Sequence, residues 1–553
     1  MRKKLLFLIV VIFSVNLFSQ TAKYPYPIIF LHGLVSSDNT WTQAITALSG
    51  SAKVFDVCLD HGGNRATASL TNDISIIGWR DGTSTASPNR LYVMNFDNTR
   101  FQTSGHSAHT LSNQSAIYKQ GIALKEMIRA VLTIENASKV ILIGHSMGGL
   151  EIREYLQRGY DGTTNGRGSN WVDQSSSSGH SVAHVVTLGT PHLGSNHSGG
   201  ILSLILSGID ESSEACRDLR FTTPTTPTAP YLFGGNESAY SWIPQPYNKD
   251  VNCNGSQVDL ISGLNSGTSF NPAMSLPSNI WYTWITSNYL GRNEDGLVDL
   301  SCQWLYSGTT ITPQSADTLL LNVHHIDEPN NTAAIIRGID EPANFNYAYD
   351  ISISSVIKGF ITYGMNHNSY DKDVFKFTAT NNGAKDVTVK NTNSGTDSLY
   401  VYDGTTLLTG IAIGNGTFST AIQMSQSKVY YIVITGHATA TSWQNPYSVQ
   451  ISPNSGSSIK DNINLNYNFA LEQNYPNPFN PETIISYQIP FSGIVTLKLF
   501  DILGREAAEL VNEEKTAGRY DVKFNGSKLP SGIYIYRLTG NNVNISKKMT
   551  LMK

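Results

Sequence analysis

The chain has 553 residues, a formal net charge of −4 and a charged fraction of 14%. This length allows about two to four domains, each large enough for its own core. The charge balance has no polyanion-binding signature, so we expect no nucleic-acid partner. The four cysteines include no Cys-x-x-Cys pair, which argues against a structural zinc site.

The first 20 residues have the pattern of a secretory signal peptide. A basic start at residues 2–4 precedes an apolar run from Leu5 to Val15, and small or polar residues surround Ser19. The run is too short to span a bilayer, so we expect residues 1–20 to be cleaved. No later segment is long and apolar enough to serve as an anchor, and we expect a mature chain without a transmembrane segment.

Export from the cytoplasm makes the cysteines candidates for disulfides. Four cysteines allow three pairings, and the sequence alone does not choose among them. The cysteines are Cys58, Cys216, Cys253 and Cys302.

Residues 27–34, Pro-Ile-Ile-Phe-Leu-His-Gly-Leu, predict a buried strand that ends in a glycine turn. A helical pattern follows at residues 115–134. Residues 140–149, Val-Ile-Leu-Ile-Gly-His-Ser-Met-Gly-Gly, then predict a strand buried on both faces, a tight turn and a helix. Residues 184–188 add another strand. Strands that alternate with helices in this way are typical of a doubly wound α/β sheet.

Gly-x-Ser-x-Gly at a strand-to-helix turn is typical of a nucleophile elbow, which makes Ser146 the candidate nucleophile. A serine that only caps a helix is the alternative. Residues 105–107 and 179–181 repeat Gly-His-Ser, but neither copy follows a buried strand. If Ser146 is a nucleophile, the backbone N–H groups of Leu34 and Met147 are expected to form an oxyanion hole. Otherwise residues 27–34 are only a core strand with a glycine turn.

A polar insertion occupies residues 195–250. Its apolar patch, residues 201–206, is either a lid over an apolar substrate site or an ordinary buried helix.

Two later strands lead to candidates for the rest of a catalytic triad. A strand expected at residues 280–286 is followed by Asp295, and one at 318–323 is followed by His324 and His325. A histidine at this edge of the sheet can take the serine proton while the aspartate orients its ring.

Two other acids, Glu294 and Asp299, are rivals for the role of the triad acid. Each candidate acid is alternatively an ordinary solvated loop carboxylate.

Residues 24–340 resemble the secreted bacterial lipases of the α/β-hydrolase family. The shared motifs are residues 27–34, 144–148, 295–298 and 325–328. The resemblance implies that Ser146 is the nucleophile, Asp295 the acid and His325, which begins the His-hydrophobic-Asp-Glu run, the base. It implies a secreted serine ester hydrolase, first of all a triacylglycerol lipase, without an organic cofactor. A short-chain carboxylesterase, phospholipase or amidase on the same triad is the alternative, and a catalytically silent surface adhesin is another.

Calcium-dependent members of that family bind a structural ion through the aspartate two residues after the histidine, which makes Asp327 a candidate calcium ligand. No second aspartate matches the family pattern clearly. Residues 250–255 copy the first half of a calcium loop, but Ile261 stands where the closing glutamate belongs. The family also has a cysteine shortly after the triad acid, which implies a bridge from Cys302 to Cys216 or Cys253.

Residues 341–453 change to short alternating strands with Gly, Asn and Thr turns, as in a β-sandwich. Their motifs at residues 371–377, 399–404, 430–434 and 447–451 resemble the pre-peptidase C-terminal domain of secreted enzymes. The resemblance implies an accessory role in binding or stability, and an inert spacer is the alternative.

A polar linker, residues 454–470, precedes the last module. Residues 471–553 resemble the C-terminal sorting domain of type IX secretion through residues 474–481, 501–504, 531–534 and 547–549. The resemblance implies passage across an outer membrane by that machinery, to the surface or the medium. A plain β domain is the alternative. The expected architecture is thus a doubly wound α/β-hydrolase domain at residues 21–340 followed by two all-β sandwiches.

Overall fold

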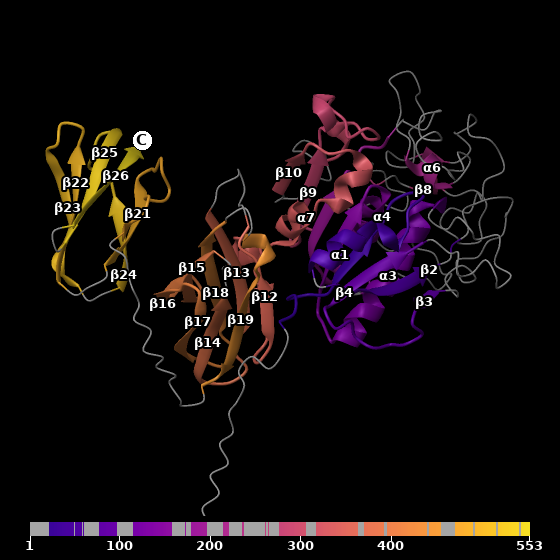
Figure 1. The fold of residues 1–553 in the computed structure, drawn as a ribbon, viewed down its shortest axis with the longest axis horizontal. Coiled ribbons are helices and arrows are strands. Elements are labelled where there is room, and N and C mark those ends of the chain that lie inside the picture. The colour runs from indigo at the N-terminus through magenta and orange to yellow at the C-terminus, as the bar shows by residue number, and fades with distance from the viewer. Residues whose placement is uncertain are drawn as a thin grey trace, which may run out of the picture.

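The computed structural model divides the chain into three units, which follow one another along the long axis of the molecule (Figure 1). The described residues are 22–48, 50–57, 59, 77–96, 114–157, 172, 179–195, 214–219, 235–236, 260–261, 264, 276–305, 317–362, 370–391, 395–438, 442–454, 470–489, 493–515, 518–540 and 543–552. The expected signal peptide, the apolar patch at 201–206 and the segment 250–255 lie outside them.

The first unit is built on an eight-stranded sheet with the order β10-β9-β6-β5-β1-β4-β2-β3. Every neighbouring pair is parallel except β2 with β3. The strands are β1 (Ile28–Leu31), β2 (Lys53–Val57), β3 (Ile77–Trp79), β4 (Leu91–Asn95), β5 (Val140–His145), β6 (Val182–Leu188), β9 (Trp281–Ser287) and β10 (Asp317–Leu321), and a separate pair is formed by β7 (Gly235–Asn236) and β8 (Leu260–Ile261). The helices are α1 (Thr42–Leu48), α3 (Ile117–Glu135), α4 (Met147–Gln157), α6 (Glu214–Leu219) and α7 (Thr332–Ile339), with 3₁₀ turns η1 (Asp38–Trp41), η5 (Gly179–Ser181), η8 (Tyr289–Gly291), η9 (Leu300–Cys302) and η10 (His325–Asn330).

Helices cover both faces of this sheet, because its strands are apolar on both sides. Ile28 and Phe30 of β1 pack in one core, together with residues of α1 and α7. Ile29 and Leu31, which alternate with them, pack in a second core with residues of α3 and α4. Consecutive strand residues point to opposite faces, so a strand that is buried on both sides becomes a continuous apolar run. The α/β expectation for the N-terminal part is confirmed.

The second unit pairs two antiparallel-rich sheets, ordered β11-β13-β18-β15-β16 and β12-β19-β14-β17. Their strands are β11 (Tyr349–Asp350), β12 (Val356–Gly359), β13 (Tyr370–Thr378), β14 (Gly383–Asn391), β15 (Thr396–Asp403), β16 (Thr406–Ala412), β17 (Gly416–Met424), β18 (Val429–His437) and β19 (Tyr447–Pro453), with 3₁₀ turns η11 (Phe345–Tyr347) and η13 (Ser442–Gln444). Residues of both sheets, such as Phe375 and Val449, share one core.

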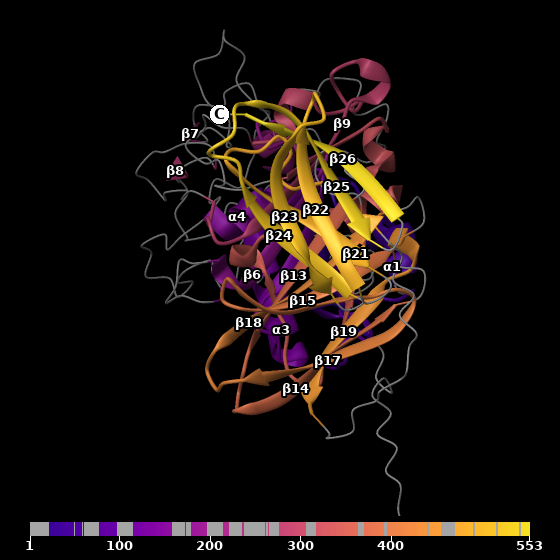
Figure 2. The same ribbon diagram turned by 90° about the vertical axis from the view of Figure 1, so that its left-hand side faces the viewer.

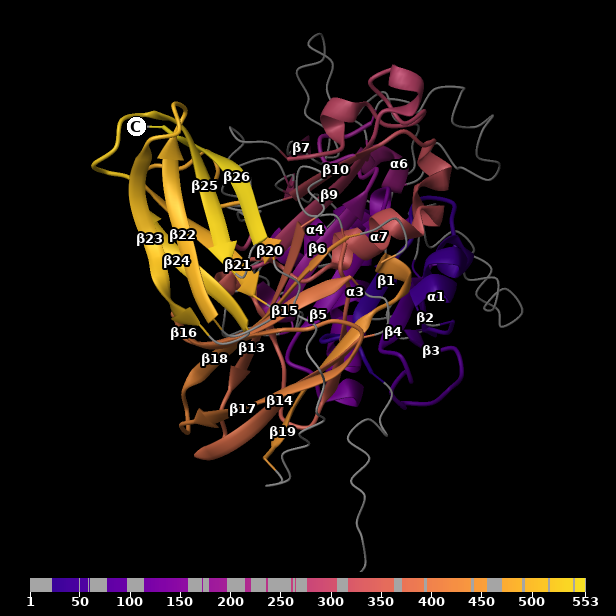
Figure 3. The same cartoon turned by 60° about the vertical axis from the view of Figure 1, so that its left-hand side comes forward.

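The third unit is also all β, with sheets ordered β20-β21-β24 and β23-β22-β25-β26. Its strands are β20 (Ala470–Leu471), β21 (Glu482–Ile489), β22 (Gly493–Asp501), β23 (Glu506–Lys515), β24 (Gly518–Asn525), β25 (Gly532–Gly540) and β26 (Val543–Leu551). In Figure 2 this unit, coloured yellow, faces the viewer, and Figure 3 shows its long strands running next to one another. The all-β expectation for the C-terminal part is confirmed. Among the described residues, no helix is long and apolar enough to span a membrane.

Candidate active site

Ser146 lies at the sharp turn between β5 and α4. All six residues of β5 are buried, whereas Ser146 is partly exposed. Its φ of 55° is in the left-handed region, which non-glycine residues seldom adopt, and its N–H donates to the Leu188 carbonyl at 2.8 Å. The turn therefore raises the serine side chain out of the core at the carboxyl edge of the sheet, as an elbow requires.

The glycines around Ser146 let the strand and the helix approach closely. A Cβ atom on Gly144 would lie 2.6 Å from the Gly148 carbonyl carbon, and one on Gly148 would lie 2.6 Å from the Leu31 carbonyl oxygen. A Cβ on Gly149 would collide with the Thr190 side chain. Both glycines of Gly-x-Ser-x-Gly are thus required by backbone packing.

Asp295 and His325 form a buried hydrogen-bonded pair. Nδ1 of His325 lies 2.8 Å from Oδ2 of Asp295, and the two side chains are 5% and 0% exposed. The other carboxylate oxygen accepts the N–H groups of Leu297 at 2.9 Å and Val298 at 2.7 Å. The His325 N–H donates to the Asp295 carbonyl at 2.9 Å, so backbone and side chain both hold the two residues together.

The rival residues lie elsewhere. Glu294 and Asp299 form a β-bridge with each other and are partly exposed. The His324 ring stands edge-on to the Tyr289 ring, with centroids 5.3 Å apart. Among the candidate acids and histidines from the sequence, the pair in hydrogen-bond contact is therefore Asp295 and His325.

The surroundings of His325 favour its protonated form. Burial by itself lowers the pKa of the ring, but the charge and hydrogen bond of Asp295, with a further contribution from Glu328, outweigh burial and raise the pKa above its usual value. An imidazole so placed is stabilised when it accepts a proton.

His145 links the serine turn to His325. Its Nε2 donates to the His325 carbonyl at 2.9 Å, and the two rings are 4.7 Å apart. Burial holds the pKa of His145 well below its usual value, so its ring is neutral.

Asp295 occupies Nδ1 of His325, which leaves Nε2 as the nitrogen available to Ser146. In the described structure the Ser146 hydroxyl makes no hydrogen bond to His325.

The backbone N–H groups of Leu34 and Met147 flank the serine. A Cβ on Gly33 would lie 2.7 Å from the Ser146 Cβ and 3.2 Å from its Oγ, so the Gly33–Leu34 peptide lies against Ser146. Met147 is the first residue of α4, where N–H groups have no partner inside the helix. No hydrogen bond of the described residues uses either N–H group.

Glu328 is a site residue that the sequence analysis did not single out. Its Oε2 lies 3.4 Å from Nε2 of His145 and 3.7 Å from Nδ1 of His325, and the side chain is fully buried. Burial first, then the Asp295 charge, raise the pKa of Glu328 to about 8, against the lowering effect of His325. Gly189 leaves the space for it, since a Cβ there would lie 2.0 Å from Oε2.

His145, His325 and Glu328 are close enough together to be considered as metal ligands. They do not fit that role, because the nitrogens that face Glu328 are already hydrogen bonded to the His325 carbonyl and to Asp295. Asp327, the expected calcium ligand, is exposed and lies outside every candidate metal group of the described residues. The structure leaves its assignment untested.

A second candidate metal group lies between the first two units. Oxygen atoms of Asp340, Glu341 and Asp373 lie within 4.8 Å of one another. One oxygen of each carboxylate is buried without a hydrogen-bond partner. Burial, followed by repulsion from Asp371 and then from the other acids of the group, raises the pKa of Asp340 and Asp373, and burial is also the main cause that raises the pKa of Glu341 to about 8. Clustered oxygen ligands of this kind suit a hard cation such as Ca²⁺.

The expected disulfide from Cys302 is wrong. Cys302 is a buried free thiol that packs with Leu297 and Val298, close to the Asp295 loop. Its side chain is held by apolar contacts, without a second sulfur. The side chains of Cys58, Cys216 and Cys253 lie outside the described residues.

An apolar cluster adjoins the two expected oxyanion-hole residues. Its members come from the β1 loop, the starts of α3 and α4, α6 and a turn residue after β8: Leu34, Ala116, Ile117, Tyr118, Ile122, Met147, Leu150, Ala215 and Leu264. Asp218 of α6 accepts the Ile117 N–H at 2.9 Å and so caps α3, whose own N-cap residue offers no side-chain bond. The helix α6 is thereby fastened over this cluster.

Two family models match parts of the chain. Residues 110–257, which include the Ser146 turn, match lecithin:cholesterol acyltransferase, and residues 473–552 match the secretion system C-terminal sorting domain. Asp295 and His325 lie outside the first match. No curated protein matches the sequence.

Several solved structures are partly similar. A protein from Listeria innocua is 13% identical, with a TM-score of 0.29, and the alignment covers 56% of this chain and 91% of that one. The pre-peptidase C-terminal domain of a Bacillus anthracis collagenase is 14% identical, with a TM-score of 0.16 and coverage of 20% and 98%. These scores are too low to establish a shared fold. From the two family matches, the chain carries a hydrolase-like α/β domain related to lecithin:cholesterol acyltransferase and a type IX sorting domain, and it is exported by that secretion machinery to the cell surface or the medium.

Proposed function

We propose that the protein is a secreted serine ester hydrolase that cleaves acylglycerols. The observation that carries the proposal is the buried Asp295–His325 hydrogen bond, tied through His145 to the turn that exposes Ser146. A serine, a histidine and an acid that act in this order activate a hydroxyl for nucleophilic attack.

In this reaction Ser146 Oγ attacks the ester carbonyl while His325 Nε2 takes its proton. Asp295 holds the Nδ1–H and stabilises the imidazolium. The N–H groups of Leu34 and Met147 stabilise the negative oxygen of the tetrahedral intermediate. The C–O bond to the leaving alcohol then breaks, the alcohol takes the proton from His325, and water hydrolyses the acyl-enzyme by the same steps. The reaction needs no organic cofactor.

The apolar cluster beside the oxyanion hole supports an apolar acyl group as the substrate. Leu34 and Met147 belong to it, so the groups that would hold the carbonyl oxygen are continuous with apolar side chains. The members of this cluster are buried, so they form an apolar wall beside these two groups, and a long acyl chain that packs against such a wall is favoured over acetate by the hydrophobic effect.

The proposal is tested by Ser146→Ala in the mature chain, with Ser181→Ala as the matched control. Ser181 follows the same Gly-His dipeptide, has a φ of 64° and is also partly exposed, but it precedes a strand rather than a helix. We expect Ser146→Ala to lose both hydrolysis of emulsified triacylglycerol and labelling by a fluorophosphonate, and Ser181→Ala to keep both. Full activity in Ser146→Ala would refute the mechanism.

A series of p-nitrophenyl esters from acetyl to palmitoyl, a phospholipid and an amide then separates a lipase from a short-chain carboxylesterase, phospholipase or amidase. A chain that is neither labelled nor active on any of them would instead be a catalytically silent adhesin.

Acyl transfer to an alcohol is the second candidate, because the match to lecithin:cholesterol acyltransferase covers the Ser146 turn. An acyl-enzyme can be intercepted by an alcohol instead of water. Added sterol or glycerol would then give a new ester at the expense of free fatty acid, and chromatographic product analysis distinguishes the two outcomes.

A further inference from the structure

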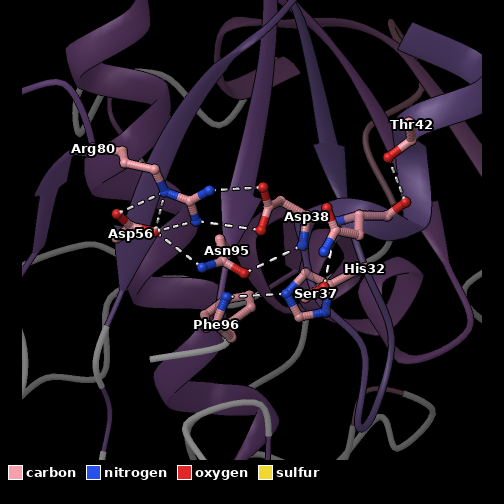
Figure 4. Close-up of polar contacts among 9 residues, drawn as sticks. His32, Ser37, Asp38, Thr42, Asp56, Arg80, Asn95 and Phe96 are labelled. Atoms are coloured by element: carbon pink, nitrogen blue, oxygen red, sulfur yellow. Dashed lines mark hydrogen bonds and ion pairs between the residues drawn. The ribbon is translucent and has the colours of Figure 1, made fainter. Parts of the chain in front are cut away.

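The loop that carries Leu34 is held at both of its ends by side chains that take no part in the proposed reaction. Figure 4 shows His32 with Phe96, and the side chains around Asp38 at the far end. The loop runs from Gly33, after β1, to Asp38, at the start of η1. One hydrogen-bonded group acts on the Gly33 carbonyl and another on Asp38.

His32 acts at the first end. The Phe96 N–H donates to Nε2 of His32 at 3.0 Å, and Nδ1 of the same ring lies 2.9 Å from the Gly33 carbonyl oxygen. Because Nε2 accepts a hydrogen bond, the proton of the neutral ring must be on Nδ1, which therefore donates to Gly33. The ring is fully buried, and the contact fixes its tautomer.

The Gly33 carbonyl and the Leu34 N–H belong to the same peptide group. A peptide is planar, and in its trans form the C=O and the N–H point in opposite directions. A hydrogen bond that fixes the oxygen therefore also fixes the direction of the N–H. Gly33 packs against Ser146, so this peptide group adjoins the proposed reacting centre.

Asn95, Arg80 and Asp56 act at the other end. Asn95 Oδ1 accepts the Asp38 N–H at 3.2 Å, and Arg80 Nη1 donates to the Asp38 carboxylate at 2.8 Å. Arg80 Nη2 also donates at 2.7 Å to Asp56, whose buried carboxylate accepts Asn95 Nδ2 at 2.9 Å. Figure 4 shows these side chains as one connected group.

The loop between the two ends is strained. Val35 has a φ of 54°, a left-handed conformation that is unfavourable for a β-branched residue. Such strain persists only where the surroundings fix the backbone. A loop held only at its far end could relax by turning the Gly33–Leu34 peptide.

We propose that His32 is the positioning residue of the oxyanion hole: its Nδ1–H holds the Gly33–Leu34 peptide so that the Leu34 N–H points at the oxygen that develops charge. This inference rests on the proposed function. It predicts an effect on kcat rather than on KM, because the charge develops only after the substrate has bound.

Two substitutions at position 32 separate the two contacts of the ring. The amide nitrogen of His32→Asn takes the place of Nδ1 and keeps the bond to Gly33. The longer His32→Gln places its amide near Nε2, where it keeps the Phe96 contact and loses the Gly33 contact. We expect kcat per fluorophosphonate-labelled site to fall about 10- to 100-fold in His32→Gln, with KM within about twofold, and to stay within about threefold of the parent in His32→Asn.

Equal losses in both variants, or none in His32→Gln, would overturn the inference. If His32→Gln does not fold, Arg80→Met decides, with Arg129→Met as the control for an exposed arginine in an ion pair. Arg80→Met should lower kcat about tenfold at unchanged KM, since the far end of the loop is released. An unchanged kcat there also overturns the inference. Activity in Ser146→Ala is a different result, because it refutes the proposed function itself.

Discussion

The Tyr349 hydroxyl of the second unit lies 2.7 Å from Nδ1 of His184 on strand β6 of the first unit. The other ring nitrogen of His184 bonds to Thr283 at 2.9 Å, and burial lowers the pKa of the ring to about 3, so the histidine is neutral. Lys23, ahead of β1, pairs with the sandwich strand β12 through two backbone hydrogen bonds. One apolar core continues from the hydrolase sheet into the sandwich. The sandwich is therefore packed against the α/β unit and is not a loosely tethered module.

Tyr349→Phe tests this packing. The substitution leaves Nδ1 of His184 buried without a partner, which should lower the free energy of unfolding by about 1–3 kcal/mol. Tyr347→Phe is the matched control, because its hydroxyl bonds to the Ser278 carbonyl at an exposed position. Urea denaturation gives the free energy. Peptide-level hydrogen exchange should show β9 and β18 losing protection together, and an effect confined to β18 would mean that the two units unfold separately.

Asp295→Asn tests the orientation of the histidine. An amide can donate to Nδ1 of His325 and so favour the tautomer whose proton is on Nε2, where it cannot accept the serine proton. We expect kcat to fall by about 10⁴-fold, with little change in KM. Glu294→Gln and Asp299→Asn, the rival acids, should stay within about threefold of the parent. A large loss in either control, with activity kept in Asp295→Asn, would move the acid to the rival position.

The pH profile of kcat/KM tests the charge state of His325. The base acts in its neutral form, and its pKa is raised above the ordinary value, so activity should fall as the pH drops through a midpoint above about 6.5. Glu328→Gln removes one of the groups that raise this pKa and should shift the acid limb to lower pH. Glu294→Gln, which removes a partly exposed carboxylate, should leave the limb in place. If the acid limb of the profile moves equally in Glu328→Gln and Glu294→Gln, the shift comes from the change in net charge and not from the contact between Glu328 and His325.

The sequence predicted the elements that carry local patterns. The strand before Ser146 and the strands before Asp295 and His325 were identifiable because parallel strands buried on both faces become apolar runs, and the glycines mark the turn. Glu328 was missed because nothing in its local sequence distinguishes a buried carboxyl from a solvated one. The Cys302 pairing was wrong because a disulfide depends on the distance and direction of two Cβ atoms, which chain spacing does not encode.

Contacts between the first and second units also could not be predicted from the sequence. Tyr349 and His184 are 165 positions apart, and each is an ordinary strand residue in its own segment. The same holds for the loop of Leu34. The His-Gly-Leu motif indicated the oxyanion donor. Asn95, on β4, and Arg80, in the turn after β3, hold the far end of its loop and have no motif of their own. These residues become partners only because the fold brings distant segments of the chain together, and no local sequence pattern marks them.

Calcium addition and chelation test the group formed by Asp340, Glu341 and Asp373. These carboxylates and the neighbouring Asp371 repel one another once they ionise, and a bound divalent cation would offset that repulsion. We expect calcium at about a hundred times its Kd to stabilise the protein by about 2.7 kcal/mol and EDTA to reverse this, as measured by urea denaturation at pH 8. Asp373→Asn should lose the response to calcium and yet be at least as stable as the parent in EDTA, because one repelling charge is gone. Asp327→Asn is the matched control and should keep the response. If Asp327→Asn abolishes it instead, the ion is bound at the loop after His325 and not between the two units.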